Sequence, residues 1–170
     1  MADKRPLFAK ILAVLLIICL VPAAVFAIKA GVSNLYYFQA ERQAVHWGGN
    51  RGRPSLQVVA HAQTLIQRAL SLWPQNPEYL NLASQISGWH GFVVAAESDS
   101  PDAAISYYRE ALDMLRLSLR LRPAYAKTWA LLAEFKVLVG ERDAEWLAAR
   151  EKALALGGAD AKIVDRMMRL

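Results

Sequence analysis

The stretch Ser118-Leu119-Arg120-Leu121-Arg122-Pro123 decides the fold of this chain, because its pattern occurs three times. Each copy has a small residue, then Leu, any residue and Leu, followed within two residues by Pro or Gly. The other two copies are Ala69–Pro74 (ALSLWP) and Ala153–Gly158 (ALALGG). Pro and Gly at such positions end helices. The first copy begins 49 residues before the second, and the third begins 35 residues after it. Recurrence at this spacing indicates stacked helical units that present a surface for binding.

Apolar residues recur at helical spacing on both sides of these stops, which predicts a series of helices. Pro- or Gly-containing breaks separate the segments, and no stretch shows the alternation of a strand. The helix ending at Arg122 is apolar on two sides, so it needs two neighbours. The sequence predicts an all-α fold, with helices over residues 54–73, 78–94, 101–122, 124–139, 143–156 and, as a terminal cap, 161–170.

The stretch 122–143, RPAYAKTWALLAEFKVLVGERD, resembles the tetratricopeptide repeat (TPR), a helical hairpin of about 34 residues. Trp129 and Leu132 stand near the positions of the Trp and Leu that mark such a repeat, and Lys136 replaces its usual Tyr. The resemblance implies a short TPR-like α-solenoid of about three helical hairpins plus the cap helix.

Residues 11–28 (ILAVLLIICLVPAAVFAI) contain no charged side chain. Extended by residues 7–9, the run reaches about 20 residues, which is enough to cross a bilayer as a helix. One interpretation is an N-terminal transmembrane anchor. The other is a cleaved signal peptide, with residues 25–27 (Val-Phe-Ala) as the cleavage site. The length of the run favours the anchor.

The basic residues on either side of this run predict its orientation. Lys4, Arg5 and Lys10 precede it, and only Lys29 and Arg42 lie in the comparable stretch beyond. The positive-inside rule therefore predicts a single-pass protein with a cytoplasmic N-terminus and the repeats on the other side. The sequence divides into a cytoplasmic tail and transmembrane anchor (1–29), a juxtamembrane helix and linker (30–53) and a TPR-like repeat domain (54–170).

A closer resemblance spans roughly residues 69–157. The order R-P-x-x-x-x-T-W-A-x-L-A-x-x-K-x-x-x-G, then D-A-E-W-x-x-A and A-L-x-L-G, is similar to the VpsP-type proteins. These are small single-pass membrane proteins of bacterial exopolysaccharide biosynthesis clusters. The resemblance implies an accessory or scaffold protein in exopolysaccharide biosynthesis or export, placed in the bacterial inner membrane with a periplasmic repeat domain. Its partners would be proteins of an envelope polysaccharide machinery. The alternative is a general cell-envelope TPR adaptor for secretion, pilus or chaperone machinery.

In TPR stacks, the first helix of each hairpin lines a concave groove in which partners dock. Transferred to this chain, the resemblance implies a partner-binding groove with one aromatic residue, which suits protein recognition. Its residues are Glu78, Asn81, Gln85, Trp89, Lys127 and Glu134. A second surface is a basic stripe of Arg109, Arg116 and Arg120 on the helix 101–122, suited to an acidic partner or a polysaccharide. The alternative is a solvated face on which Asp113 pairs with Arg116.

The sequence predicts no enzyme, catalytic residue or cofactor. His46, His61 and His90 lack the spacing of metal ligands, and Cys19 is the single cysteine, so we expect no metal. The net charge of +5 is too small and too dispersed to indicate nucleic-acid binding. The glycine-rich stretch 48–53 is interpreted as a polar hinge, or else as a contact with phosphates near the membrane. The acidic residues 141–145 suit a helix N-terminus.

Overall fold

The computed structural model describes residues 5–47 and 52–170, with side chains from residue 13 onward. Lys4, and residues 48–51 of the predicted hinge, lie outside the described residues, as do the side chains of Arg5 and Lys10. The described part is all-helical and contains no strand, which confirms the predicted all-α fold. Its helices are α1 (Arg5–Ala44), α2 (Leu56–Leu72), α3 (Pro77–Ser98), the 3-10 turn η1 (Pro101–Ala104), α4 (Ile105–Leu121), α5 (Ala126–Leu138), α6 (Ala144–Gly157) and α7 (Ala161–Met168).

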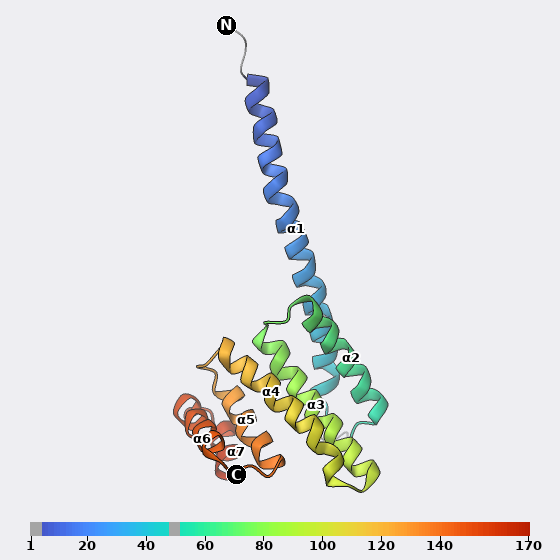
Figure 1. Ribbon diagram of the computed structural model, residues 1–170, viewed down its shortest axis with the longest axis vertical. Helices are drawn as coiled ribbons and strands as arrows, with labels where there is room; N and C mark the ends of the chain where they lie inside the picture. The colour runs from blue at the N-terminus through green and yellow to red at the C-terminus, as the bar shows by residue number, and fades with distance from the viewer. Residues whose placement is uncertain (1–4, 48–51) are drawn as a thin grey trace.

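Within the described residues, α1 is the one helix long and apolar enough to cross a membrane. Its large apolar side chains between Val14 and Ile28 are exposed along the part that projects from the other helices (Figure 1). This arrangement is compatible with a single-pass membrane anchor. The helix continues through Pro22 and on to Ala44, so the juxtamembrane stretch is an extension of α1.

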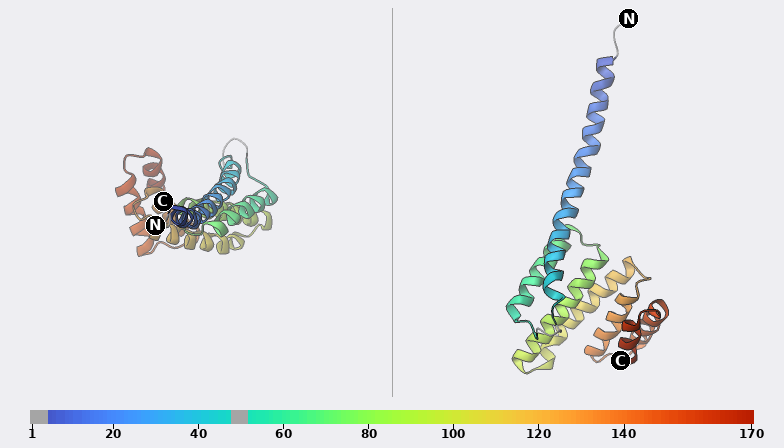
Figure 2. Two further views of the ribbon diagram at one scale, coloured as in Figure 1. Left: turned by 90° about the horizontal axis from the view of Figure 1, so that it is seen from above. Right: turned by 180° about the vertical axis from the view of Figure 1, so that it is seen from behind.

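The C-terminal part of α1 and the helices α2 to α6 form antiparallel pairs of neighbours in the sequence. The C-terminal part of α1 packs most extensively on α2, α3 on α4, and α5 on α6, while α7 covers α5 and α6 (Figure 1). Seen from above, α2 to α7 follow an open arc, and the C-terminal part of α1 lies on its inner side (Figure 2). The inner side of this arc carries the site described below.

Short polar residues start most of these helices. The side chains of Ser55, Asn76, Asp143 and Asp160 accept hydrogen bonds from backbone N–H groups in the first turns of α2, α3, α6 and α7. The predicted helix 101–122 begins differently, because its first turn is the 3-10 turn η1. Such turns are frequent at helix N-termini, and this one follows a loop that begins with Asp99 in the left-handed conformation.

Two apolar cores hold the arc together. We call the first the proximal core; it joins α1, α2 and α3 around Val59, Ile66 and Ile86. The second, the distal core, joins α4 to α7 around residues such as Leu115 and Leu132. Because Ser33 and Ala40 of α1 are fully buried, the C-terminal part of α1 belongs to the helical domain as well as continuing the anchor.

The distal core contains a buried lysine. Lys136 is only 1% exposed, and its Nζ pairs with Glu141, with Asp143 at 2.6 Å and with Glu145 at 3.3 Å. Burial lowers the pKa of Lys136, but its hydrogen bonds to these carboxylates outweigh that effect and raise the pKa to about 12. The acidic residues 141–145 therefore neutralise Lys136, besides supplying the cap Asp143 at the start of α6.

A close approach between α3 and α5 connects the two cores. A Cβ added at Gly88 of α3 would lie 2.5 Å from the ring of Phe135 in α5. Asn81 and Thr128 reinforce the same contact, because their buried side chains hydrogen-bond to each other at 2.9 and 3.1 Å. Side-chain contacts therefore join α3 and α5 on the inner side of the arc.

Candidate binding groove

Three neighbouring cavities follow the inner side of the arc, with volumes of about 960, 310 and 150 Å³. They share residues of their walls, because Gln85 and Trp89 line the two smaller cavities, and Glu134 and Arg166 line the two larger ones. Lys127 lines both the largest and the smallest. We call these three adjoining cavities, lined mainly by α3, α5 and α7, the inner groove.

All six residues predicted to form a partner-binding groove line the inner groove. Glu78, Asn81, Gln85, Trp89 and Lys127 surround the smallest cavity, and Glu134 borders the other two. The structure corrects one detail, because Asn81 is buried and its amide is used to hold Thr128. Asn81 therefore connects α3 to α5 and is not an open contact position.

The Glu78 carboxylate is also engaged in an ion pair within the domain. Its carboxylate pairs with Arg122 at 2.6 Å, and the Arg122 guanidinium lies 3.5 Å from the centroid of the Tyr125 ring. Arg122 thereby connects the start of α3 to the residue before α5. Gln85 donates a hydrogen bond to the backbone oxygen of Asn81 at 3.0 Å. Of the predicted set, Trp89 and Lys127 remain the most available for contact with a partner.

The cavity of about 310 Å³ in the inner groove is aromatic and apolar. The ring of Trp89 makes edge contacts with Trp47 and Phe92, with centroids 6.0 and 5.5 Å apart. Phe92 and Leu138 are about half exposed on the walls of this cavity, and Tyr108 and Phe135 form further parts of them. This part of the groove can take an apolar side chain of a partner.

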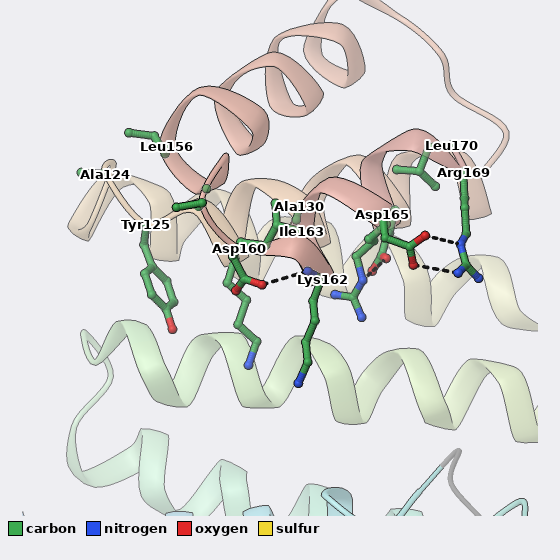
Figure 3. A pocket seen from close by; sticks show the side chains of 16 residues that line it. Ala124, Tyr125, Ala130, Leu156, Asp160, Lys162, Ile163, Asp165, Arg169 and Leu170 are labelled. Atoms are coloured by element: carbon green, nitrogen blue, oxygen red, sulfur yellow. Dashed lines mark hydrogen bonds and ion pairs between the residues drawn. The ribbon is translucent and has the colours of Figure 1, made fainter.

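The α7 end of the inner groove is charged (Figure 3). Arg166 pairs with Glu134 at 2.6 Å, and Arg169 pairs with Asp165 at 2.7 Å. The side chain of Lys162 extends from α7 toward α3 in Figure 3. Burial raises the pKa of Glu134, and the guanidinium of Arg166 opposes that rise.

Two lysines at this end are not neutralised. Lys127 and Lys162 are exposed, and neither forms an ion pair within the described part of the chain. Arg166 and Arg169 have carboxylate partners, and the Asp160 carboxylate accepts a hydrogen bond from the Lys162 N–H, so four cationic and three carboxylate side chains leave the lining of the largest cavity with one positive charge in excess. The groove therefore offers two ammonium groups beside an aromatic patch.

Several residues of the inner groove were not predicted. Lys162 and Arg166 lie on the polar face of the cap helix, and Tyr37 and Glu41 lie on α1. Tyr37 donates a hydrogen bond to Glu41 at 2.8 Å, and burial together with that carboxylate raises the pKa of Tyr37. The polar face of residues 161–170 could have indicated that the cap helix lines the groove. Nothing in the sequence shows that the C-terminal part of α1 lines it as well.

The predicted basic stripe is not a set of equivalent cations. Arg109 and Arg120 are exposed, but Arg116 pairs with Asp113 at 2.9 Å and holds Glu145 through two hydrogen bonds of 2.9 and 2.8 Å. These hydrogen bonds and charges raise the pKa of Arg116. Arg116 therefore joins α4 to α6, and the interpretation of a local pair with Asp113 describes it better than a free basic stripe.

Within the described residues, no group of three or more His, Cys, Asp or Glu side chains is placed to hold a metal ion. His90 lies against the Tyr107 ring, with centroids 4.4 Å apart, and contacts Gln63 through Nδ1. Burial lowers the pKa of His90.

No protein-family model matches the chain, and a search of curated proteins finds no match. The groove geometry is therefore the main basis for a functional proposal.

Proposed function

We propose that this protein is a membrane-anchored scaffold that holds a segment of a partner protein in the inner groove. The observation that carries the proposal is that three cavities adjoin one another along α3, α5 and α7, with Trp89 lining the two smaller ones and Lys127 and Lys162 lining the largest. Aromatic anchors contribute much of the energy of protein interfaces. A tether to the membrane would raise the effective concentration of the scaffold near membrane-bound partners.

We assign the three helical pairs and α7 to a short TPR-like solenoid. The repeated Leu-x-Leu stops and the 35-residue spacing of the last two copies support this assignment. The pairing of α1 with α2, α3 with α4 and α5 with α6 is what a stack of hairpins requires. In this assignment α3 and α5 are the first helices of their hairpins, and they carry most of the predicted groove residues.

The process that the scaffold serves is proposed from the sequence resemblance to VpsP-type proteins. On that basis the partner belongs to an exopolysaccharide polymerase, glycosyltransferase or export complex. The repeat domain then lies in the periplasm and the N-terminus in the cytoplasm, as the basic residues before the apolar run indicate. A periplasm-active reporter fused after Leu170 is expected to be active, and a silent reporter would contradict this orientation.

The chemistry of the groove favours an acidic partner segment with an apolar side chain. Lys127 and Lys162 attract carboxylates, and the cavity between Trp89 and Leu138 accepts the apolar group. Exposed ion pairs contribute about 0.2–1 kcal/mol each. Reversing both lysines to Glu replaces attraction by repulsion and is expected to weaken binding about tenfold.

In-cell photo-crosslinking tests this proposal with a matched pair of positions on α6. Leu156 lines the largest cavity, whereas Leu147, equally exposed at 47%, is not among the residues lining the groove. A photoreactive residue at position 156 is expected to capture a polysaccharide-machinery protein through an acidic segment. The K127E/K162E variant should reduce that capture, and position 147 should not produce it.

Other outcomes of the crosslinking have definite meanings. Capture of a secretion, pilus or chaperone component at position 156 would overturn the polysaccharide assignment and support the general adaptor. Equal capture at positions 147 and 156, no capture at position 156, or capture unaffected by K127E/K162E would overturn the groove as the binding site.

A further inference from the structure

A separate hollow of about 260 Å³ lies where α1 leaves the helical domain. Phe26 and Lys29 of α1 form one side, and the end of α2 with the following turn forms the other, through Leu72, Trp73, Pro74 and Gln75. This turn lies at the end of the domain from which the apolar part of α1 projects (Figure 1). The hollow is distinct from the inner groove and shares no lining residue with it.

The depth of this hollow follows from one aromatic contact. The rings of Phe26 and Trp73 meet edge to face, with centroids 4.9 Å apart. Phe26 lies two residues before the end of the uncharged run 11–28. Since a helix rises about 1.5 Å per residue, Phe26 lies about 3 Å inside the level at which that run ends, and the Trp73 ring contacts Phe26 there. If α1 spans a bilayer, Trp73 lies at the boundary between hydrocarbon and headgroups.

The residues of the hollow suit that boundary. Tryptophan is enriched at membrane interfaces, because its ring is apolar while its N–H is polar. Phe26 is exposed beside it, and Pro74 and Gln75 are exposed at the tip of the turn. Among the residues that line the hollow, Lys29 alone carries a charge, and its ammonium group can meet a lipid phosphate. Apolar walls with one cation at the rim match the two parts of a phospholipid.

We propose that this hollow binds one phospholipid of the leaflet from which the helical domain emerges. Its acyl chain lies against Phe26, Leu72 and Trp73, and its phosphate lies at Lys29. The turn after α2 is then a second membrane contact beside the anchor. With two contacts the domain is held in one orientation on the bilayer, whatever protein occupies the inner groove.

A fluorescence experiment on the full-length protein tests the depth. In a Cys19→Ser background, Gln75→Cys or Ser98→Cys carries an environment-sensitive dye, and the protein is placed in vesicles of phosphatidylethanolamine and phosphatidylglycerol. Ser98 is exposed at the opposite end of α3, about 30 Å away by helix rise. Lipids with a nitroxide near the headgroup are expected to quench the dye at position 75 several-fold more than at position 98. Equal quenching at both positions would overturn the second membrane contact.

A labelling experiment tests the bound lipid. Phosphatidylglycerol with a photoreactive acyl chain is incorporated into the same vesicles, and labelled residues are located by mass spectrometry. Label is expected on residues 72–75, and Lys29→Glu should reduce it several-fold while label on the anchor residues 14–21 stays unchanged. Arg42→Glu, which removes an exposed cation of α1 outside the hollow, serves as the control and should have no effect. Absence of label on residues 72–75, or label unaffected by Lys29→Glu, would overturn the proposal.

Discussion

The proximal and distal cores are held by different kinds of polar interaction. In the proximal core, neutral groups connect α1 to α3: Ser33 donates a hydrogen bond to the Tyr79 hydroxyl at 2.9 Å, and that hydroxyl donates to Asn34 at 2.7 Å. The ring of Tyr79 also stacks on Tyr37, with centroids 5.1 Å apart. None of these contacts requires a charge.

In the distal core, charged groups perform the corresponding task. Lys136 is surrounded by Glu141, Asp143 and Glu145, and Glu145 is shared with Arg116 of α4. This cluster connects α4, α5 and α6. Because its members titrate and are screened by salt, the distal core should respond to pH and ionic strength. The proximal core should respond less, since its charged contacts are Tyr37 with Glu41 and Arg68 over the Tyr36 ring. The proximal core, which joins α1 to the rest of the helical domain, is therefore less sensitive to pH and salt than the distal core.

Replacement of Lys136 should have the largest effect. Lys136→Met leaves three carboxylates facing one another without their shared cation, which we expect to lower the free energy of unfolding of the distal core by about 3 kcal/mol. Hydrogen exchange, followed segment by segment, should show faster exchange in α5 and α6 and little change in α2. Lys127→Met, at an exposed lysine, is the control and should change stability by less than about 0.5 kcal/mol. Equal loss of protection in α2 would contradict the division into two cores.

Local sequence signals were sufficient to predict the helices. The Leu-x-Leu stops predicted the ends of α2, α4 and α6 to within one residue, since Pro and Gly act on the residues next to them. Two boundaries differ: the predicted helix 78–94 continues to Ser98 as α3, and at the start of the helix 101–122 a 3-10 turn replaces the first α-helical turn. Whether a helix begins with a 3-10 or an α-helical turn depends on small differences in local packing, which composition does not reveal.

Contacts between distant residues could not be predicted in the same way. The resemblance to a repeat gave positions along α3 and α5 that do line one groove, but it could not show that Asn81 pairs with Thr128. No local pattern predicts that Lys136 contacts the carboxylates of residues 141–145, because the sequence explains these acidic residues by a helix N-terminus. Ser33 presents the same difficulty, because it lies just beyond the apolar run of α1, yet it is buried against Tyr79.

Acidification should have the next largest effect and should again separate the two cores. Hydrogen bonds from Lys136 and the Trp146 N–H lower the pKa of Asp143, and Arg116 lowers that of Glu145. Their stabilising contribution is present above the unfolded pKa values of about 4 and is lost as pH falls through the lower folded values. Lys136 contributes fully below its unfolded pKa of about 10.4, and this is lost as pH rises through about 12.

Hydrogen exchange at several pH values, corrected for intrinsic rates, measures this response. We expect α6 to lose protection between about pH 4 and pH 2 while α2 remains protected over the same range. Lys136→Met should abolish most of the difference. Simultaneous loss of protection in α2 and α6 would show that the domain unfolds as one unit and would contradict the comparison.

Removal of the Tyr79 hydroxyl should affect the proximal core by a smaller amount. Tyr79→Phe deletes one accepted and one donated neutral hydrogen bond, so we expect a loss of about 1–2 kcal/mol that does not depend on salt. The measurement is urea unfolding monitored in α2 and α3 at low and high ionic strength. Tyr36→Phe is the matched control in α1, because the Tyr36 hydroxyl makes no hydrogen bond within the described residues. A salt-dependent loss at Tyr79 would mean that the proximal core also relies on charge.

Exchange of Arg116 for lysine should have the smallest effect. The guanidinium of Arg116 holds Glu145 through two parallel hydrogen bonds, and a lysine can replace only one of them. Because the pair is partly exposed, Arg116→Lys should cost about 0.5 kcal/mol at low salt and nearly nothing in about 1 M salt. Arg109→Lys, at an exposed arginine on the same helix, should show neither the cost nor the salt dependence. If the cost of Arg116→Lys persisted in high salt, Arg116 would stabilise the distal core through packing of its side chain, and the contrast with the neutral proximal core would rest on Lys136 alone.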